Sequence, residues 1–161
     1  MRALTPWALL ALLAAANAGA EDPPPNYVAA FAGTTVAYRP SGGPWDGHQH
    51  DFVLTAGLGR FVTPKLALEV DLGPTWISGD YAAFSIVPGV VWAFSPHAYL
   101  AARFPVAVDP DAALYASPGF GLSHTFANGL TPILELNGVT RLDRDQGDLG
   151  ITVTLGVLYS F

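Results

Sequence analysis

Cysteine is absent from the 161 residues, and charged residues are scarce, at 12% of the chain. Without cysteine the chain has no disulfide, no thiolate metal site and no cysteine-linked lipid anchor. The charged fraction is about half of that in ordinary soluble domains. Hydrophobic residues make up 51%, yet beyond residue 20 no apolar run reaches the roughly 18 residues of a membrane helix. The sequence therefore predicts no helical membrane span, and its apolar content needs another explanation.

Basic residues are also few, with seven Lys and Arg against 13 Asp and Glu and a net charge of −6. Binding to nucleic acid depends on a basic surface that neutralises phosphates. The acidic balance therefore argues against nucleic acid as a partner.

The N-terminus, "MRALTPWALLALLAAANAGA", has the order of a secretory signal peptide. Arg2 supplies the positive charge, a short apolar run follows, and small residues at alternate positions 16–20 suit a cleavage site. We therefore expect residues 1–20 to be a signal peptide that is removed on export. Residues 21–26, "EDPPPN", are expected to form an extended leader, because consecutive prolines favour an open chain.

The rest of the chain alternates with a period of two residues, which is typical of strands. Most segments run for 10–14 residues, long for ordinary strands but suitable for tilted strands that cross a bilayer. The eight predicted strands are Tyr27–Tyr38, His50–Val62, Leu66–Thr75, Tyr81–Phe94, Ala98–Val108, Ala113–Thr125, Leu130–Val139 and Leu149–Phe161.

The connections between these strands alternate in character. Three are short, at 63–65, 95–97 and 126–129, whereas those at 39–49, 76–80, 109–112 and 140–148 are mostly longer and acidic. Short turns at one end and longer loops at the other, on an even number of strands, are typical of an outer-membrane barrel. The pattern predicts an all-β fold, an eight-stranded antiparallel up-and-down transmembrane β-barrel over residues 27–161, with both termini on the periplasmic side.

The two faces of most strands differ in residue size. One face carries large apolar residues, and the other carries glycine, alanine, serine and threonine rather than the lysine and glutamate of a solvated face. Small residues suit the interior of an eight-stranded barrel. We therefore expect the bulky face to meet lipid, although the first strand is ambiguous and the seventh is weakened by Pro132 and Ile133.

Aromatic residues gather near the strand ends, as in the girdles at the two bilayer interfaces. The expected girdle residues are Trp92, Phe94, Tyr99, Phe126, Tyr159 and Phe161 at the short turns, and Trp45, Phe52, Trp76 and Tyr81 at the longer loops.

The C-terminal "GVLYSF" and the segment "GLGRFVTPKLALEVDLG" resemble small outer-membrane β-barrel proteins of the OmpA/OmpX/OmpW type. The resemblance implies an outer-membrane location in a Gram-negative bacterium. It also implies that Val157, Tyr159 and Phe161 form the C-terminal signal that the barrel-assembly machinery reads. It is one of architecture and implies no activity.

Four charged residues have the parity of the predicted lumen: Glu69, Asp71, Arg103 and Glu135. Three of them lie four or five residues above the short turns, which corresponds to roughly 10–13 Å of height. We therefore expect these charges to meet at one level as an ion-pair network that fills the lumen. A cation or proton path is the alternative interpretation of the same cluster.

Acidic residues are concentrated near the longer loops. Asp143, Asp145 and Asp148 faintly resemble a calcium-binding loop but lack its full motif. We expect a solvated acidic surface there, and the alternative is the binding of divalent ions that bridge lipopolysaccharide phosphates. Accordingly, the sequence predicts no metal site and no cofactor.

These patterns predict a monomeric integral outer-membrane barrel in contact with lipid and lipopolysaccharide, with a structural role in membrane integrity. Enzymatic activity is not expected, because alternation places Ser123 and His124 on opposite faces and no nucleophile joins the lumen charges. Two alternatives remain at this point. One is a narrow pore or carrier for small, including hydrophobic, solutes, and the other is a secreted soluble barrel with an apolar ligand cavity.

Overall fold

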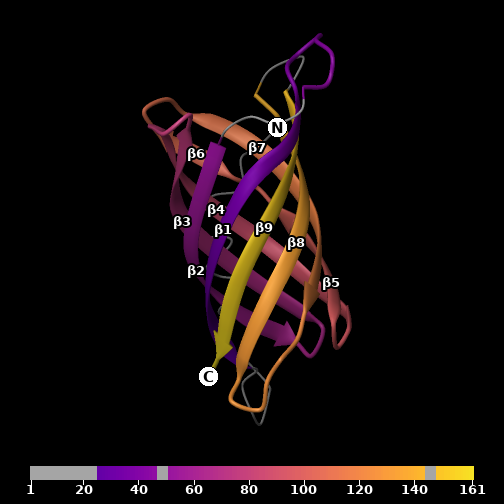
Figure 1. The fold of residues 1–161 in the computed structure, drawn as a ribbon. Coiled ribbons are helices and arrows are strands. Elements are labelled where there is room, and N and C mark those ends of the chain that lie inside the picture. The colour runs from indigo at the N-terminus through magenta and orange to yellow at the C-terminus, as the bar shows by residue number, and fades with distance from the viewer. Residues whose placement is uncertain (1–24, 47–50, 144–147) are drawn as a thin grey trace, which may run out of the picture.

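A computed structural model describes residues 25–46, 51–143 and 148–161, and these residues form one closed antiparallel β-barrel (Figure 1). The predicted signal peptide and most of the predicted leader lie outside the described residues. None of the described residues belongs to a helix that is long and apolar enough to cross a membrane. The strands are β1 (Asn26–Arg39), β2 (Asp51–Thr63), β3 (Leu66–Ile77), β4 (Asp80–Ser95), β5 (Ala98–Arg103), β6 (Val106–Asp109), β7 (Ala113–Ser123), β8 (Leu130–Arg141) and β9 (Leu149–Ser160).

Apart from β5 and β6, strands that follow one another along the chain are paired, and β1 pairs with β9 to close the barrel. Strands β5 and β6 are two parts of one stave, because both pair with β4 on one side and β7 on the other. The break falls at Pro105, which has no N–H for the sheet. Hydrogen bonds from Phe104 N to Pro88 O and from Tyr115 N to Pro105 O carry the pairing across it. The nine labelled strands therefore make eight staves, and the predicted fold class is confirmed.

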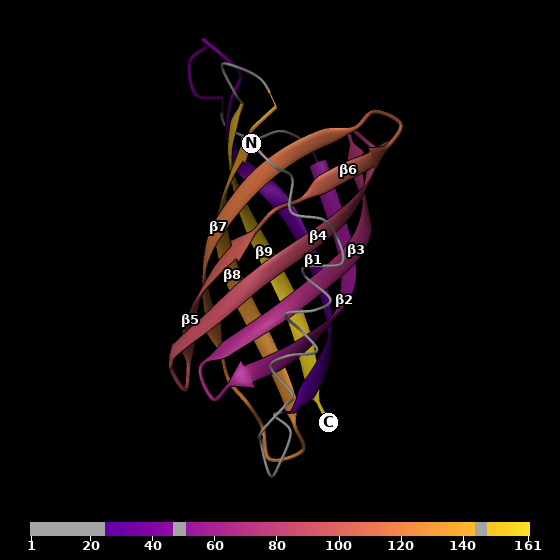
Figure 2. The ribbon, with the colours of Figure 1, turned by 180° about the vertical axis from the view of Figure 1, so that it is seen from behind.

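The ends of the barrel differ as the alternating connections predict (Figures 1 and 2). At one end, here called the turn end, the final residue Phe161 exchanges two backbone hydrogen bonds with Asn26, at 3.0 and 2.9 Å. The connections β2–β3, β4–β5 and β7–β8 also lie there. The opposite end, the loop end, carries the connections β1–β2, β3–β4, β6–β7 and β8–β9.

One connection at the loop end is much shorter than the segment 76–80 that the sequence predicts. Trp76 and Ile77 still belong to β3, and Asp80 already belongs to β4, which leaves a two-residue hairpin of Ser78 and Gly79. Both residues have positive φ, 53° and 91°. Such a turn matches the right-handed twist of the paired strands, so the hairpin closes without a longer loop.

Large apolar side chains cover the outer face, in agreement with the predicted alternation. Strand β2 shows the pattern clearly. Leu54 and Leu58 point outwards and are 44% and 65% exposed, whereas Gly59 faces inwards and is buried. The other staves contribute similar residues, among them Leu72, Ile86, Trp92, Leu100, Phe120, Leu134, Leu136 and Leu155. The barrel therefore has an apolar exterior.

Three buried aromatic side chains depart from the rule that bulky residues point outwards. Tyr27 and Phe31 of β1, the ambiguous strand, are buried in the lumen. Tyr99 of β5 is buried there as well, at 7% exposure, so its assignment to an interfacial girdle is wrong. Each of the three lies beside a glycine of the neighbouring strand in the pairing register, and these pairs are Tyr27–Gly59, Phe31–Gly156 and Tyr99–Gly121.

The glycine in each pair provides the space for the ring. A Cβ atom at Gly59 would lie 1.9 Å from the Tyr27 ring, and one at Gly121 would lie 2.0 Å from the Tyr99 ring. An aromatic ring that covers a cross-strand glycine is a known device of sheets and barrels. The glycines of the lumen face therefore leave space for these large side chains inside the barrel.

Candidate functional site

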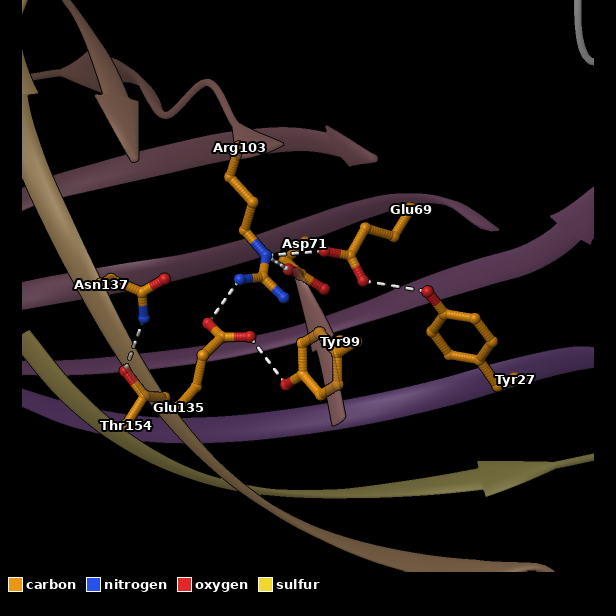
Figure 3. A network of polar contacts seen from close by, with 8 residues as sticks. All are labelled: Tyr27, Glu69, Asp71, Tyr99, Arg103, Glu135, Asn137 and Thr154. Atoms are coloured by element: carbon orange, nitrogen blue, oxygen red, sulfur yellow. Dashed lines mark hydrogen bonds and ion pairs between the residues drawn. The ribbon is translucent and has the colours of Figure 1, made fainter. Parts of the chain in front are cut away.

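The candidate site is a cluster of charged and aromatic side chains in the lumen, here called the plug (Figure 3). Its members are Tyr27, Glu69, Asp71, Tyr99, Arg103 and Glu135. All six are buried, with exposures between 2% and 7%. They come from β1, β3, β5 and β8, which are the first, third, fifth and seventh staves of the barrel, so the cluster joins its walls across the lumen.

Arg103 forms the centre of the plug. Its Nε donates to Glu69 Oε1 at 2.6 Å, and its Nη1 donates to Glu135 Oε1. Asp71 Oδ2 lies further away, 3.8 Å from Nε. The guanidinium also lies over the ring of Phe31, with 5.6 Å between Cζ and the ring centroid, which is within the range of a cation–π contact. One side chain on β5 therefore contacts β1, β3 and β8.

The two lumen tyrosines complete the pairing of the glutamates. The Tyr27 hydroxyl donates to Glu69 Oε2 at 2.9 Å, and the Tyr99 hydroxyl donates to Glu135 Oε2 at 2.7 Å. Both oxygens of each glutamate are thus hydrogen-bonded. Buried carboxylates need such partners, because taking them out of water otherwise costs several kcal/mol, by rough estimate.

The structure brings together the four lumen charges that the sequence singles out, Glu69, Asp71, Arg103 and Glu135. Sequence reasoning missed the two tyrosines, as well as Phe31 and Asn137. Asn137 Nδ2 lies 3.4 Å from Thr154 Oγ1, at the long end of hydrogen-bonding range, while its Oδ1 is buried without a hydrogen-bond partner. A signal for the aromatic residues exists in principle, namely a glycine at the paired position, but it can be read only once the strand register is known.

The plug separates two cavities. The loop-end cavity has a volume of about 440 Å³ and is lined by Asp71, Glu135 and Asn137, among others. The turn-end cavity has a volume of about 540 Å³ and is lined by Tyr27, Glu69 and Tyr99, among others. Phe31 and Arg103 line both cavities, so the lumen is divided at the level of these two side chains.

The loop-end acids make separate contacts. Asp143 accepts two hydrogen bonds from Arg141, at 2.6 and 2.9 Å, and Asp148 Oδ1 accepts one from Ser41 N at 2.9 Å. Asp145 lies outside the described residues. Among residues 25–46, 51–143 and 148–161, no group of three His, Cys, Asp or Glu is arranged to hold a metal ion. The predicted solvated acidic surface and its alternative, the binding of divalent ions, both stay predictions.

Asp51 has a structural role at the loop end, beside an irregularity in the β1–β9 register between Thr35 and Ala37. Its carboxylate accepts hydrogen bonds from Thr35 N and Thr35 Oγ1, both at 2.5 Å, and from Thr34 Oγ1 at 3.2 Å. The side chain thus ties β2 to β1 where the regular ladder is disturbed.

We expect Asp51→Ala to lower the free energy of unfolding by about 2 kcal/mol, because it removes hydrogen bonds to a charged acceptor from Thr34 and Thr35. Urea unfolding of the detergent-solubilised protein, followed by tryptophan fluorescence, measures the change. Asp111→Ala is the matched control, since this aspartate is exposed in the β6–β7 connection. Equal midpoints for the two variants would show that Asp51 contributes nothing to the barrel.

Comparisons with known proteins support the fold and no more specific identity. No family model matches the chain, and no curated protein matches it. A solved structure from work on the de novo design of transmembrane β-barrels is similar, with a TM-score of 0.55 and 20% sequence identity. The match covers 88% of this chain and 98% of that chain. At this level of identity the likeness shows the fold alone, which is that of a transmembrane β-barrel.

Proposed function

We propose that the protein is an integral outer-membrane β-barrel with a structural role in membrane integrity, and that the plug keeps its lumen closed to ions. The observation that carries the proposal is the position of Arg103, which bridges Glu69 and Glu135 between the two cavities. An ion that crossed the lumen would have to displace these buried, charge-assisted contacts, which are among the stronger interactions in proteins.

The distribution of side chains supports insertion into a bilayer. Leucine, valine and aromatic side chains cover the exterior, while the buried charges lie inside. Because every stave is paired with two neighbours, no sheet edge would be left unpaired in hydrocarbon. A soluble barrel with an apolar ligand cavity would have the opposite arrangement, so this alternative is not favoured.

The expected partners follow from the same arrangement. Lipid and lipopolysaccharide would contact the apolar exterior and the loop end, and the protein would act as a monomer. Val157, Tyr159 and Phe161 lie on the outer face at the turn end, at 40%, 48% and 64% exposure. These side chains are therefore accessible to the barrel-assembly machinery in the proposed role of a C-terminal signal.

The first test is whether the protein reaches the outer membrane. We expect it in the sarkosyl-insoluble fraction of Gram-negative cells, migrating faster in unheated than in heated gel samples because the barrel resists detergent. Recovery in the soluble periplasmic fraction would contradict the proposal and favour the secreted barrel.

The second test is conductance in planar bilayers. We expect no channel openings above baseline for the wild type in molar KCl, because the plug blocks the lumen. Replacement of the bridging groups by small ones (Glu69→Ser, Arg103→Ser and Glu135→Ser together) is expected to give discrete openings. Regular openings of the wild type would contradict closure and favour the narrow pore or carrier instead.

A further inference from the structure

The lining of the loop-end cavity carries an excess of negative charge. It includes the carboxylates of Asp51, Asp71, Glu135 and Asp148, whereas Arg103 is the one cationic side chain among the described residues that line the cavity. Negative groups that line a narrow cavity with low-dielectric walls raise the local concentration of cations. The cavity is therefore suited to a positively charged ligand.

Asp71 is the carboxylate in this cavity that lacks a hydrogen bond. Asp51 accepts from Thr34 and Thr35, Asp148 accepts from Ser41, and both oxygens of Glu135 are in use. Asp71 is 3% exposed, and among the described residues its one polar contact is the 3.8 Å ion pair with Arg103. Arg103 is already shared between two closer glutamates, so it leaves Asp71 poorly compensated.

A second acceptor in the same cavity also lacks a partner. Asn137 is 7% exposed and lines the loop-end cavity, and its Oδ1 has no hydrogen-bond partner among the described residues. Figure 3 shows its Nδ2 turned towards Thr154. Buried polar atoms in native proteins are nearly always paired with protein, water or an ion. A buried oxygen without a donor, together with the poorly compensated carboxylate of Asp71, indicates a positively charged ligand that oxygen atoms can coordinate.

We propose that the loop-end cavity binds a monovalent alkali cation, with the Asp71 carboxylate as its anionic ligand. Water would supply hydrogen bonds to the Asp71 carboxylate but no positive charge. Divalent cations usually take several carboxylates, whereas among the described residues Asp71 is the one carboxylate of this cavity that is not already hydrogen-bonded. Asn137 lines the same cavity. The proposal stands whether or not the lumen conducts.

The test is the dependence of folding on the cation present. The protein in zwitterionic detergent is unfolded with urea in sodium chloride, potassium chloride or N-methyl-D-glucamine chloride at equal ionic strength. We expect sodium or potassium to raise the folding equilibrium constant saturably, by about elevenfold when the cation is at ten times its dissociation constant. N-methyl-D-glucamine is too large to coordinate to Asp71 and should have no such effect.

Asp71→Asn separates site binding from general salt effects. This variant keeps the shape of the side chain but removes its charge, so it should fold and should lose the difference between the salts. Asp111→Asn, at an exposed loop-end aspartate, removes the same charge and should retain the difference. Unfolding equilibria that are equal in all three salts, or a cation effect that persists in Asp71→Asn, would overturn the proposal.

Direct observation of the ion makes the proposal testable even if Asp71→Asn does not fold. Sodium-23 NMR of the wild-type protein should show line broadening that is lost when potassium is added in excess. Broadening that is absent, or that potassium does not reduce, would also overturn the proposal.

Discussion

Arg103→Ala is expected to lower the free energy of unfolding by about 3–5 kcal/mol, which is the usual cost of removing one partner from a buried ion pair. The substitution leaves Glu69, Asp71 and Glu135 in the lumen without the guanidinium that they share. Because small domains are stable by only about 5–15 kcal/mol, the loss should be visible as a lower unfolding temperature in the heat-modifiable gel shift. An unchanged gel shift would contradict the ion-pair network.

Two further variants distinguish charge from geometry in this prediction. Arg103→Lys keeps the charge but replaces a planar fork with a single ammonium, so we expect an intermediate loss of stability. Neutral replacement of the whole ion set (Glu69→Gln, Asp71→Asn, Arg103→Met and Glu135→Gln) removes the uncompensated charges, and it should recover most of the stability lost in Arg103→Ala. If the neutral set were as unstable as Arg103→Ala, volume rather than charge would be the important property.

The fold was predictable because a closed barrel imposes a strict period of two. The large residues of β2, such as Leu54 and Leu58, could face outwards only if Thr55, Gly57 and Gly59 faced inwards. The same parity placed Glu69 and Arg103 in the lumen, and their similar height above the turns brought them together. Parity and height are local properties of each strand, so they can be read from the sequence without knowledge of the pairing.

The aromatic part of the plug was not predictable by the same reasoning. Tyr27 and Phe31 lie on β1, which seemed ambiguous because alanines occupy its outer face at Ala30 and Ala32. Tyr99 has the same parity as Arg103, but its bulk favoured the interfacial girdle over the lumen. Whether a ring fits inside depends on the residue beside it in the next strand. That information lies in the register, which joins residues as distant as Phe31 and Gly156.

Asp71 shows a second limit of sequence reasoning. Its parity correctly predicts a lumen position, but parity cannot distinguish a carboxylate that is fully hydrogen-bonded from one that is not. Glu69 gains Tyr27 as a donor, whereas Asp71, two residues further along β3, has one distant ion pair. The difference between the two acids arises from a tyrosine on another strand, and it is the basis for the proposed cation site.

Gly121→Ala is the second substitution with a large expected effect. The new Cβ would lie 2.0 Å from Tyr99 Cζ, so the ring must move and its hydroxyl must leave Glu135 Oε2. Overpacking costs about 1–3 kcal/mol, and losing a hydrogen bond to a charged acceptor costs about 1.5–3 kcal/mol. We therefore expect the free energy of unfolding to fall by about 3–5 kcal/mol, measured by urea unfolding.

The control is Gly138→Ala on the neighbouring strand β8, where the nearest atoms to a new Cβ, both of Pro118, are 4.0 Å away. Here the expected change in the free energy of unfolding is small, within about 1 kcal/mol, because the methyl group enters open space.

A double-mutant cycle then measures how much of the cost of Gly121→Ala comes from the Tyr99 ring. In a Tyr99→Ala background, Gly121→Ala should cost almost nothing, since no ring remains to be displaced. If Gly121→Ala lowered the free energy of unfolding equally with and without Tyr99, the glycine would be required for the backbone of β7. The space beside Gly121 would then not be what places Tyr99 against Glu135.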